Sequence, residues 1–208
     1  IGFNFSNIRP RGDDIQNIKN SAPGSVSNMK MINEIGNHVR AGKNRRTALI
    51  AILNVTHPDL LEFLTVKLEK HELNNFNISV GITNRFIEAV ENDEEWYFTF
   101  NNKKYYVYEL TGTNPDTKIS YFIRVPALSE SDAIGRVNNH LKHSWNDTLS
   151  DVKKVTLKAK DIWNQIFQSS VECGDPGFYN IDLANSYTNV SYFETLPSPN
   201  PCGEIPLP

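Results

Sequence analysis

The sequence predicts an α/β fold with parallel strands, interrupted by a small α+β insertion. Residues 1–96 alternate strand-like and helix-like segments, an order typical of parallel sheets. Within them, residues 47–55 form an almost wholly apolar run, which suits a strand buried on both faces of such a sheet. Residues 97–155 are instead rich in Tyr, Phe, Val and Ile, as antiparallel strands often are. We therefore divide the chain into a first α/β part (1–96), an insertion (97–155) and a second α/β part (156–208).

The first part opens with a predicted strand and turn over residues 1–12. A helix is expected from Ser25, whose side chain would cap it, to about Arg40, with Gly42 just beyond its C-terminal end. The buried strand over residues 47–55 follows.

A second helix is expected to begin at Pro58, because proline is favoured in a first helical turn. Asp59 beside it suits the positive end of the helix dipole, and the helix should continue to about Leu68. Residues 77–82 are a further predicted strand. Thr83 is then expected to cap a third helix.

The insertion is predicted to have a β-β-β-α order. Ser129 and Asp132 resemble a capping box, and the apolar stripe that follows runs to Trp145 at helical spacing. We assign the insertion no function from sequence. Its three strands are expected at residues 97–100, 104–110 and 119–125.

The second α/β part begins with a predicted core helix, whose apolar stripe runs from Ala159 to Phe167. A turn at residues 174–177 and a strand that includes residues 181–185 should follow. Asn185 is expected either near the functional loops or in a turn or cap.

Composition favours an ordinary soluble, cytoplasmic protein. The chain has 208 residues, enough for one hydrophobic core, and a formal net charge of −3, which gives no nucleic-acid or membrane signature. No apolar run approaches the roughly 18 residues of a membrane span. The two cysteines do not make a disulfide framework, and we predict no metal site.

The last nine residues contain the most reactive combination of side chains. Asn200, Cys202 and Glu204 are spaced two residues apart, so in an extended loop their side chains would point to one side. They would offer one ligand an amide, a thiol and a general acid or base. The alternative is an inert cysteine in a Pro/Gly-rich tail.

This segment resembles the finger loop of ribonucleotide reductase large subunits, and other segments resemble the same family in the same order. Thr47 stands where the family usually has glycine. The resemblance implies that residues 1–96 and 156–208 are parts of the reductase α/β barrel, the second ending in the finger loop. The other segments are residues 2–12, 20–28, 44–48, 57–63, 74–80 and 174–177.

The resemblance implies a role for each residue of the finger loop. Cys202 would become the thiyl radical that abstracts a hydrogen from the substrate ribose. Glu204 would accept the proton of the 3′-hydroxyl, and Asn200 would orient the ribose. Further contacts with the substrate would come from Asn4, Ser6, Pro201 and Gly203.

The family also has an allosteric site for a deoxynucleotide or ATP, near a dimer interface. Its loops would correspond to residues 9–21 and 67–75. Arg9 and Arg11 would contact phosphates, although an exposed charge is the alternative for Arg11. The second loop would contain or adjoin Lys67, Asn74 and Asn75. Arg45 and Arg46 would either anchor this loop or form structural ion pairs.

The form of the finger loop looks most like the adenosylcobalamin-dependent class II enzymes. A class I subunit, which takes its radical from a metal-containing small subunit, is the alternative. The implied partners are a ribonucleoside di- or triphosphate, a thioredoxin-type reductant, and a second copy or complementing chain. Cys173 does not lie where the family's redox pair lies.

We therefore expect a fragment of a reductase that is inactive alone. The alternatives are half of a split enzyme that acts as a binding or assembly module, and an unrelated α/β nucleotide-binding domain.

Overall fold

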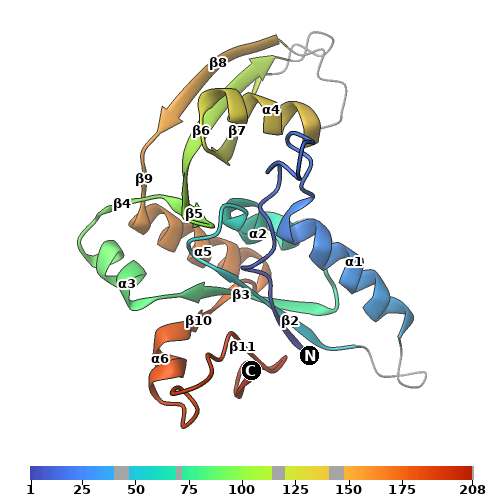
Figure 1. Cartoon of the computed structure of the whole chain (residues 1–208), viewed down its shortest axis with the longest axis vertical. Coiled ribbons are helices and arrows are strands. Elements are labelled where there is room, and N and C mark those ends of the chain that lie inside the picture. The colour runs from blue at the N-terminus through green and yellow to red at the C-terminus, as the bar shows by residue number, and fades with distance from the viewer. Residues whose placement is uncertain (40–46, 69–71, 114–119, 141–147, 208) are drawn as a thin grey trace.

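The computed structural model describes residues 1–39, 47–68, 72–113, 120–140 and 148–207 (Figure 1). Its central element is a parallel sheet with the strand order β1-β2-β3-β10. The predicted α/β fold with parallel strands is therefore confirmed. The four strands are β1 (Gly2–Asn4), β2 (Leu49–Asn54), β3 (Phe76–Ile82) and β10 (Gly177–Asn180).

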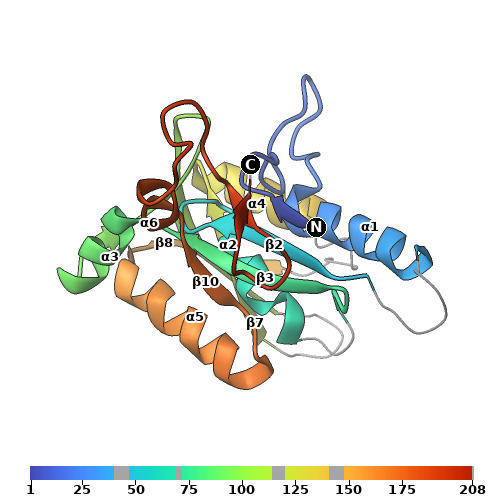
Figure 2. The ribbon, with the colours of Figure 1, turned by 90° about the horizontal axis from the view of Figure 1, so that it is seen from below.

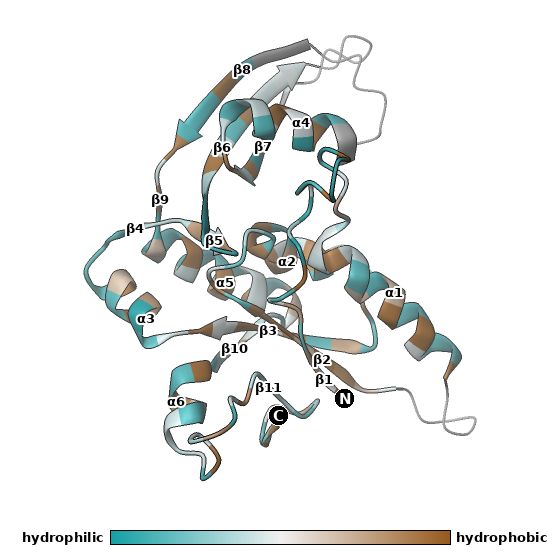
Figure 3. Cartoon of the chain, in the orientation of Figure 1, coloured by the Kyte–Doolittle hydropathy of each residue, from teal (hydrophilic) through white to brown (hydrophobic). Residues whose placement is uncertain are grey.

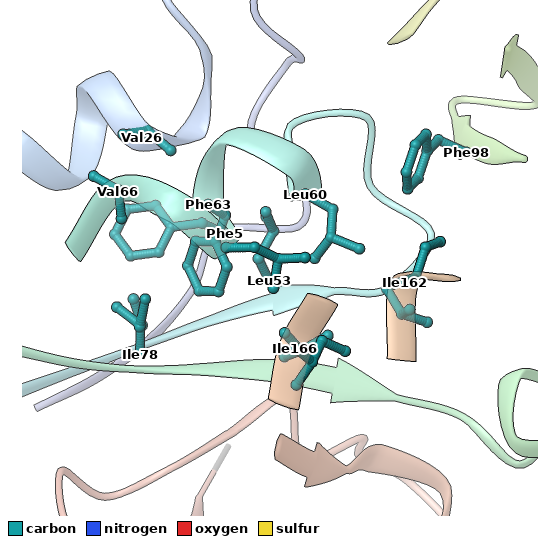
Figure 4. Close-up of a cluster of buried hydrophobic side chains, with 14 of the residues drawn as sticks. Phe5, Val26, Leu53, Leu60, Phe63, Val66, Ile78, Phe98, Ile162 and Ile166 are labelled. Atoms are coloured by element: carbon teal, nitrogen blue, oxygen red, sulfur yellow. The ribbon is translucent and has the colours of Figure 1, made fainter. Parts of the chain in front are cut away.

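Helices cover one face of this sheet, and the C-terminal segment lies on the other (Figures 1 and 2). The main core lies between the sheet and the helices, where Leu53 and Ile78 pack with Phe63, Ile162 and Ile166 (Figure 4). The helices around this core are α1 (Gly24–His38), α2 (Leu60–Thr65), the short 3-10 helix η1 (Val66–Leu68), α3 (Asn84–Glu91) and α5 (Ala159–Cys173).

Strand β2 is buried on both faces, as its apolar run predicts. Leu53 points into the main core, whereas its neighbour Ile52, also fully buried, points to the other face. There a Cβ on Gly81 would lie 3.2 Å from Ile52 Cγ2 and 2.7 Å from Ile181 Cδ1 of α6 (Ile181–Ser186). The second face of the sheet is thus covered by the chain that follows β10.

The predicted cap of α1 is wrong. Ser25 lies inside the helix, and its backbone N–H donates a 2.7 Å hydrogen bond to Asp59 Oδ2. A carboxylate from a distant part of the chain therefore does what the Ser25 side chain was expected to do. The helix ends at His38, and Gly42 lies outside the described residues. The cap by Thr83 is confirmed, because its hydroxyl accepts from Phe86 N.

The insertion forms its own antiparallel sheet, with β6 in the middle. The three predicted strands are confirmed, but a fourth, β8, was not predicted. Its sequence lacks the period-two alternation of a strand, because two polar residues separate its apolar ones (Figure 3), so its strand character depends on its pairing with β6. The elements are β5 (Phe98–Phe100), β6 (Lys103–Thr113), β7 (Ser120–Ala127), α4 (Glu130–His140) and β8 (Thr148–Val155).

Two short strands pair where the insertion joins the α/β part of the chain. Strand β4 (Glu95–Trp96) pairs antiparallel with β9 (Leu157–Lys158). Phe98 and Tyr105 are fully buried in the main core, whereas a smaller core between α4 and the sheet contains Leu110 and Val137. The predicted stripe of α4 continued to Trp145, which lies outside the described residues.

The predicted strand over residues 181–185 is wrong, because these residues form helix α6. The Asn180 side chain accepts a 2.9 Å hydrogen bond from Leu183 N and so caps this helix. The strand lies one segment earlier, in β10. In the described part of the chain, no helix has the length and apolar character needed to cross a membrane.

Candidate functional site

Asn200, Cys202 and Glu204 lie in the turn of a short hairpin. Strands β11 (Ser198–Pro199) and β12 (Pro206–Leu207) pair antiparallel on either side of it. Asn200 N donates to Ile205 O at 2.9 Å, and Asn200 Oδ1 accepts from Ile205 N at 3.0 Å. The segment is therefore a closed turn and not the extended loop that was predicted.

The tip of this hairpin projects into open space. Gly203 has φ +84°, and a Cβ on it would have no neighbour within 4 Å among the described residues. Its N–H donates a 2.8 Å bond to Asn200 O, which closes the turn around Cys202. Cys202 and Glu204 are exposed and Asn200 is half-buried. The thiol is thus accessible, and the described residues alone do not enclose it.

The hairpin lies on the face of the parallel sheet that the main core does not use (Figure 2). Alternation along the strands explains this, because Gly2, Asn4 and Asn77 are out of phase with the core residues beside them. Asn77 Nδ2 donates a 2.9 Å hydrogen bond to Pro201 O, and Asn4 Nδ2 donates a 2.7 Å bond to Pro197 O. Both contacts fix the cysteine turn relative to the sheet.

Gly2 is the third residue that lets the hairpin lie close to the sheet. A Cβ at this position would lie only 2.0 Å from Pro199 O, so any larger residue would displace β11. Sequence reasoning missed Gly2 and Asn77 as supports of the hairpin. Their out-of-phase positions in predicted strands are the signal that could have found them.

Asn4 and Ser6, predicted to contact substrate, have structural partners. Asn4 Oδ1 accepts from Ser6 N at 2.9 Å, and Ser6 Oγ accepts from Asn54 N at 2.8 Å. Ser6 also lines an open cleft of about 570 Å³ with Tyr97 and Lys104. A substrate role for Asn4 and Ser6 stays a prediction.

The segment of residues 9–21 is anchored at its base by the motif at residues 57–59. Asp59 Oδ1 accepts from Arg11 N at 2.8 Å, while Oδ2 accepts from Ser25 N. His57 Nε2 lies 2.9 Å from Ile8 O, and His57 Nδ1 accepts from Asp59 N at 3.0 Å. Burial lowers the pKa of His57 despite the nearby carboxylate of Asp59, which favours the neutral ring that donates to Ile8.

The two arginines of this segment differ in their partners. The Arg9 guanidinium is exposed and donates to the carbonyl of Asp14. Arg11 Nη2 lies 2.7 Å from Glu62 Oε1, so Arg11 forms an ion pair within the chain. Arg9 is therefore the more accessible of the two for a phosphate.

Structural contacts also occupy two of the residues expected in the second loop. Lys67 Nζ donates to Phe76 O at 2.7 Å and lies 2.5 Å from Asp175 Oδ2. Asn75 Nδ2 donates to Asn37 Oδ1 of α1 at 2.7 Å. Asn74 is exposed, and Arg45 and Arg46 lie outside the described residues.

Asn185 and Cys173 lie away from the cysteine turn. Asn185 Nδ2 donates to Ile181 O and to Leu196 O, and its Oδ1 accepts from Leu196 N at 2.7 Å. It therefore ties the segment before the hairpin to α6. Cys173 is a free, exposed thiol at the end of α5, on the other face of the sheet from Cys202. Within the described ranges, no cluster of His, Cys, Asp and Glu is suited to hold a metal ion.

Comparison with known proteins gives a consistent result. The family model for the ribonucleotide reductase barrel domain matches residues 1–208. The chain is 32% identical over 207 residues to a vitamin B12-dependent ribonucleoside-diphosphate reductase of Thermoplasma acidophilum, covering 99% of this chain and 21% of that protein. It is 30% identical to the protein of the same name from Mycobacterium tuberculosis strain H37Rv, covering 99% of this chain and 23% of that protein.

A third relative also matches over almost the whole chain. The chain is 26% identical over 211 residues to the ribonucleoside-diphosphate reductase large chain of Schizosaccharomyces pombe, covering 99% of this chain and 23% of that protein. The chain thus spans between 21% and 23% of the length of these three relatives.

Proposed function

Because the chain belongs to the ribonucleotide reductase barrel-domain family, we propose that it is the part of a reductase large subunit that carries the radical cysteine. The observation that supports this most strongly is the placement of Cys202. It lies at the tip of a closed hairpin turn that Asn77 and Asn4 hold against the face of the parallel sheet opposite the helices. A fixed, accessible thiol is what hydrogen abstraction from a bound substrate requires.

The chemistry assigned to Cys202 is a hydrogen-atom transfer. In the radical state, its sulfur takes the hydrogen from C3′ of the ribose. The C3′–H bond breaks, an S–H bond forms, and the unpaired electron moves to C3′. Because Cys202 is exposed among the described residues, the substrate and further protein must exclude water from it during the reaction.

Glu204 and Asn200 act on the ribose hydroxyls. The Glu204 carboxylate takes the proton of the 3′-hydroxyl as general base. The side chain of Asn200 orients the ribose, while its own Oδ1 keeps the turn closed through Ile205 N. The 2′-hydroxyl takes up a proton and leaves as water, and a thioredoxin-type dithiol outside this chain supplies the two electrons and two protons of the reduction and becomes a disulfide. Cys202 then returns its hydrogen atom to C3′ and is again a thiyl radical.

The radical source that we propose is adenosylcobalamin, since the relatives that are 32% and 30% identical are named vitamin B12-dependent. The accessible thiol of Cys202 fits a radical that is delivered to it from outside the described residues. When bound, adenosylcobalamin supplies an organic radical by homolysis of its carbon–cobalt bond. We assign no described residue to its binding. The proposed substrates are ribonucleoside diphosphates, as the names of these relatives indicate.

Regulation is proposed to act through the segment of residues 9–21. Its exposed Arg9 would contact the phosphates of a deoxynucleotide or ATP effector. In a homodimer this segment would lie near the interface, as the family resemblance implies.

The test is an assay of the full native enzyme with each ribonucleoside diphosphate and a dithiol reductant, with and without adenosylcobalamin. We expect deoxyribonucleotide only when adenosylcobalamin is present. Absence of product under every radical source would contradict the function. Product that forms only with a metal-containing small subunit would contradict the cofactor and leave the function in place.

A further inference from the structure

The insertion contacts the segment of residues 9–21 through a buried group of charges. Arg136 of α4, whose side chain is only 4% exposed, donates from Nη2 to Asp13 Oδ1 at 2.5 Å and from Nη1 to Arg11 O at 2.6 Å. Its Nε donates to Asp132 Oδ2 at 2.9 Å. One arginine of the insertion thus binds both the backbone and a carboxylate of the segment.

Two further hydrogen bonds join the same parts. The hydroxyl of Tyr105, a fully buried residue of β6, donates to Asp13 Oδ2 at 2.8 Å. Asn20 Nδ2 donates to Asp132 Oδ1 at 3.2 Å and to Gly12 O at 3.1 Å. Both oxygens of Asp13 therefore have donors from the insertion, and the segment is held from two elements of that insertion.

Glycines on both sides permit this close contact. Gly12 has φ +79°, and a Cβ on it would lie 2.5 Å from Arg136 Cγ. Gly135 lies in the interior of α4, where glycine costs helix stability, and a Cβ there would lie 2.6 Å from Asn20 Oδ1. The two surfaces fit only because each has a glycine opposite a longer side chain of the other.

Backbone hydrogen bonds join residues 12 and 13 to residues 21 and 22, but the segment between them has no apolar core of its own. Residues 14–19 are all exposed, and its isoleucines do not enter a core, since Ile15 is 38% and Ile18 66% exposed. His57 and Asp59 hold its N-terminal end through Ile8 O and Arg11 N, and the insertion holds residues 11, 13 and 20, on either side of the exposed stretch (Figure 1). A loop without a core of its own loses conformational entropy when it orders around a ligand, unless other contacts order it beforehand.

We propose that the insertion is a positioning element for this segment, and that Arg136 is its principal positioning residue. By ordering residues 9–21 in advance, it raises the affinity of the segment for the anionic ligand that Arg9 contacts. The nature of that ligand, a nucleotide effector, rests on the proposed function. The ordering of the segment by the insertion does not.

The experiment compares Arg136→Met and Arg136→Lys in the full native enzyme. The control is Arg124→Gln, which removes an exposed ion pair with Glu109 in the same insertion. Hydrogen–deuterium exchange of residues 9–21 is measured without nucleotide. The effector concentration for half-maximal stimulation and the kcat at saturating effector are then measured for each variant.

Arg136→Met should lose protection in residues 9–21 and need about tenfold more effector, with kcat at saturation unchanged. Arg136→Lys should recover part of both effects, because it keeps the charge but not the forked geometry. Arg124→Gln should behave as the unchanged enzyme. Unchanged protection in Arg136→Met would overturn the ordering, and lost protection with an unchanged effector response would overturn the positioning role.

Gly135→Ala is a second test of the same contact, in case Arg136→Met does not fold. Alanine is the better helix former, so α4 itself gains stability, and lost protection in residues 9–21 would come from the contact with Asn20. Full protection in this variant would count against the close fit. An enzyme whose activity responds to no nucleotide would contradict the effector role proposed for Arg9. The hydrogen–deuterium exchange data would still show whether the insertion orders residues 9–21.

Discussion

Asn77 donates a hydrogen bond of 2.9 Å from its side-chain amide to the carbonyl of Pro201, the residue directly before Cys202. Asn77 belongs to β3, an inner strand of the parallel sheet, and its side chain points away from the main core. The position of the thiol is thereby tied to a rigid part of the fold. Radical transfer between heavy atoms depends steeply on their separation, so this bond should matter for rate more than for stability.

Asn77→Ala should lower kcat by roughly tenfold to a hundredfold, because a displacement of about 1 Å at the reacting group is costly. Stability should change by no more than about 1 kcal/mol, since the bond is exposed. Turnover and urea unfolding of the full enzyme measure the two effects. Asn92→Ala, which removes an exposed amide contact to Glu94, is the control. An unchanged kcat in Asn77→Ala would show that this bond does not position the turn.

His57 should make stability depend on pH. Burial lowers the pKa of the folded-state His57 below its ordinary value of about 6.5. As the pH falls below about 6.5, His57 of the unfolded chain takes up a proton before His57 of the folded protein does. The stability that neutral His57 contributes is therefore lost as the pH falls from about 6.5 to the lowered pKa of the folded state. The contribution is fully present above the ordinary value.

The measurement is the free energy of unfolding of the native protein and of His57→Gln between about pH 7.5 and 5.5. The variant should be less stable at the upper end and lose less stability on acidification. Burial raises the pKa of Glu62, which acts in the opposite direction, but both proteins share that group. Parallel pH profiles for the two proteins would refute the assignment.

Lys67→Met should destabilise the fold by about 2 kcal/mol. The Lys67 and Asp175 side chains are each 17% exposed, and removing the ammonium leaves a largely buried carboxylate with one remaining donor, Ile78 N. Adding Asp175→Asn should restore part of the loss. Denaturant unfolding checks this, with Lys158→Met, which removes an exposed ion pair with Asp93, as the control expected to change little. Equal effects of the two lysine variants would be inconsistent with the burial argument.

Short-range sequence patterns correctly predicted the elements that depend on an apolar run or on a helix cap. The apolar run of β2 predicted burial on both faces, and the Thr83 hydroxyl was correctly predicted to cap α3. In both cases the residues that carry the signal are neighbours in sequence. The resemblance to reductases was likewise confirmed, since it rested on several short motifs in a fixed order.

Contacts between distant residues decided the remaining features. Asp59 binds the Ser25 amide across 34 residues, which removed the need for a side-chain cap on α1. The bond between Arg136 and Asp13 spans 123 residues, so no local spacing could indicate that the insertion holds residues 9–21. The turn at Asn200 was mistaken for an extended loop because its closure depends on β12 returning along β11.

The most direct test of the central claim is turnover of Cys202→Ser in the full native enzyme, with Cys173→Ser as the matched control. A hydroxyl does not replace a thiol in hydrogen-atom transfer, so Cys202→Ser should form no detectable deoxyribonucleotide while still binding substrate and effector. Cys173→Ser should keep its turnover, because that thiol lies at the end of α5 on the other face of the sheet. Turnover by Cys202→Ser near that of the native enzyme would contradict the assignment of Cys202 as the radical residue.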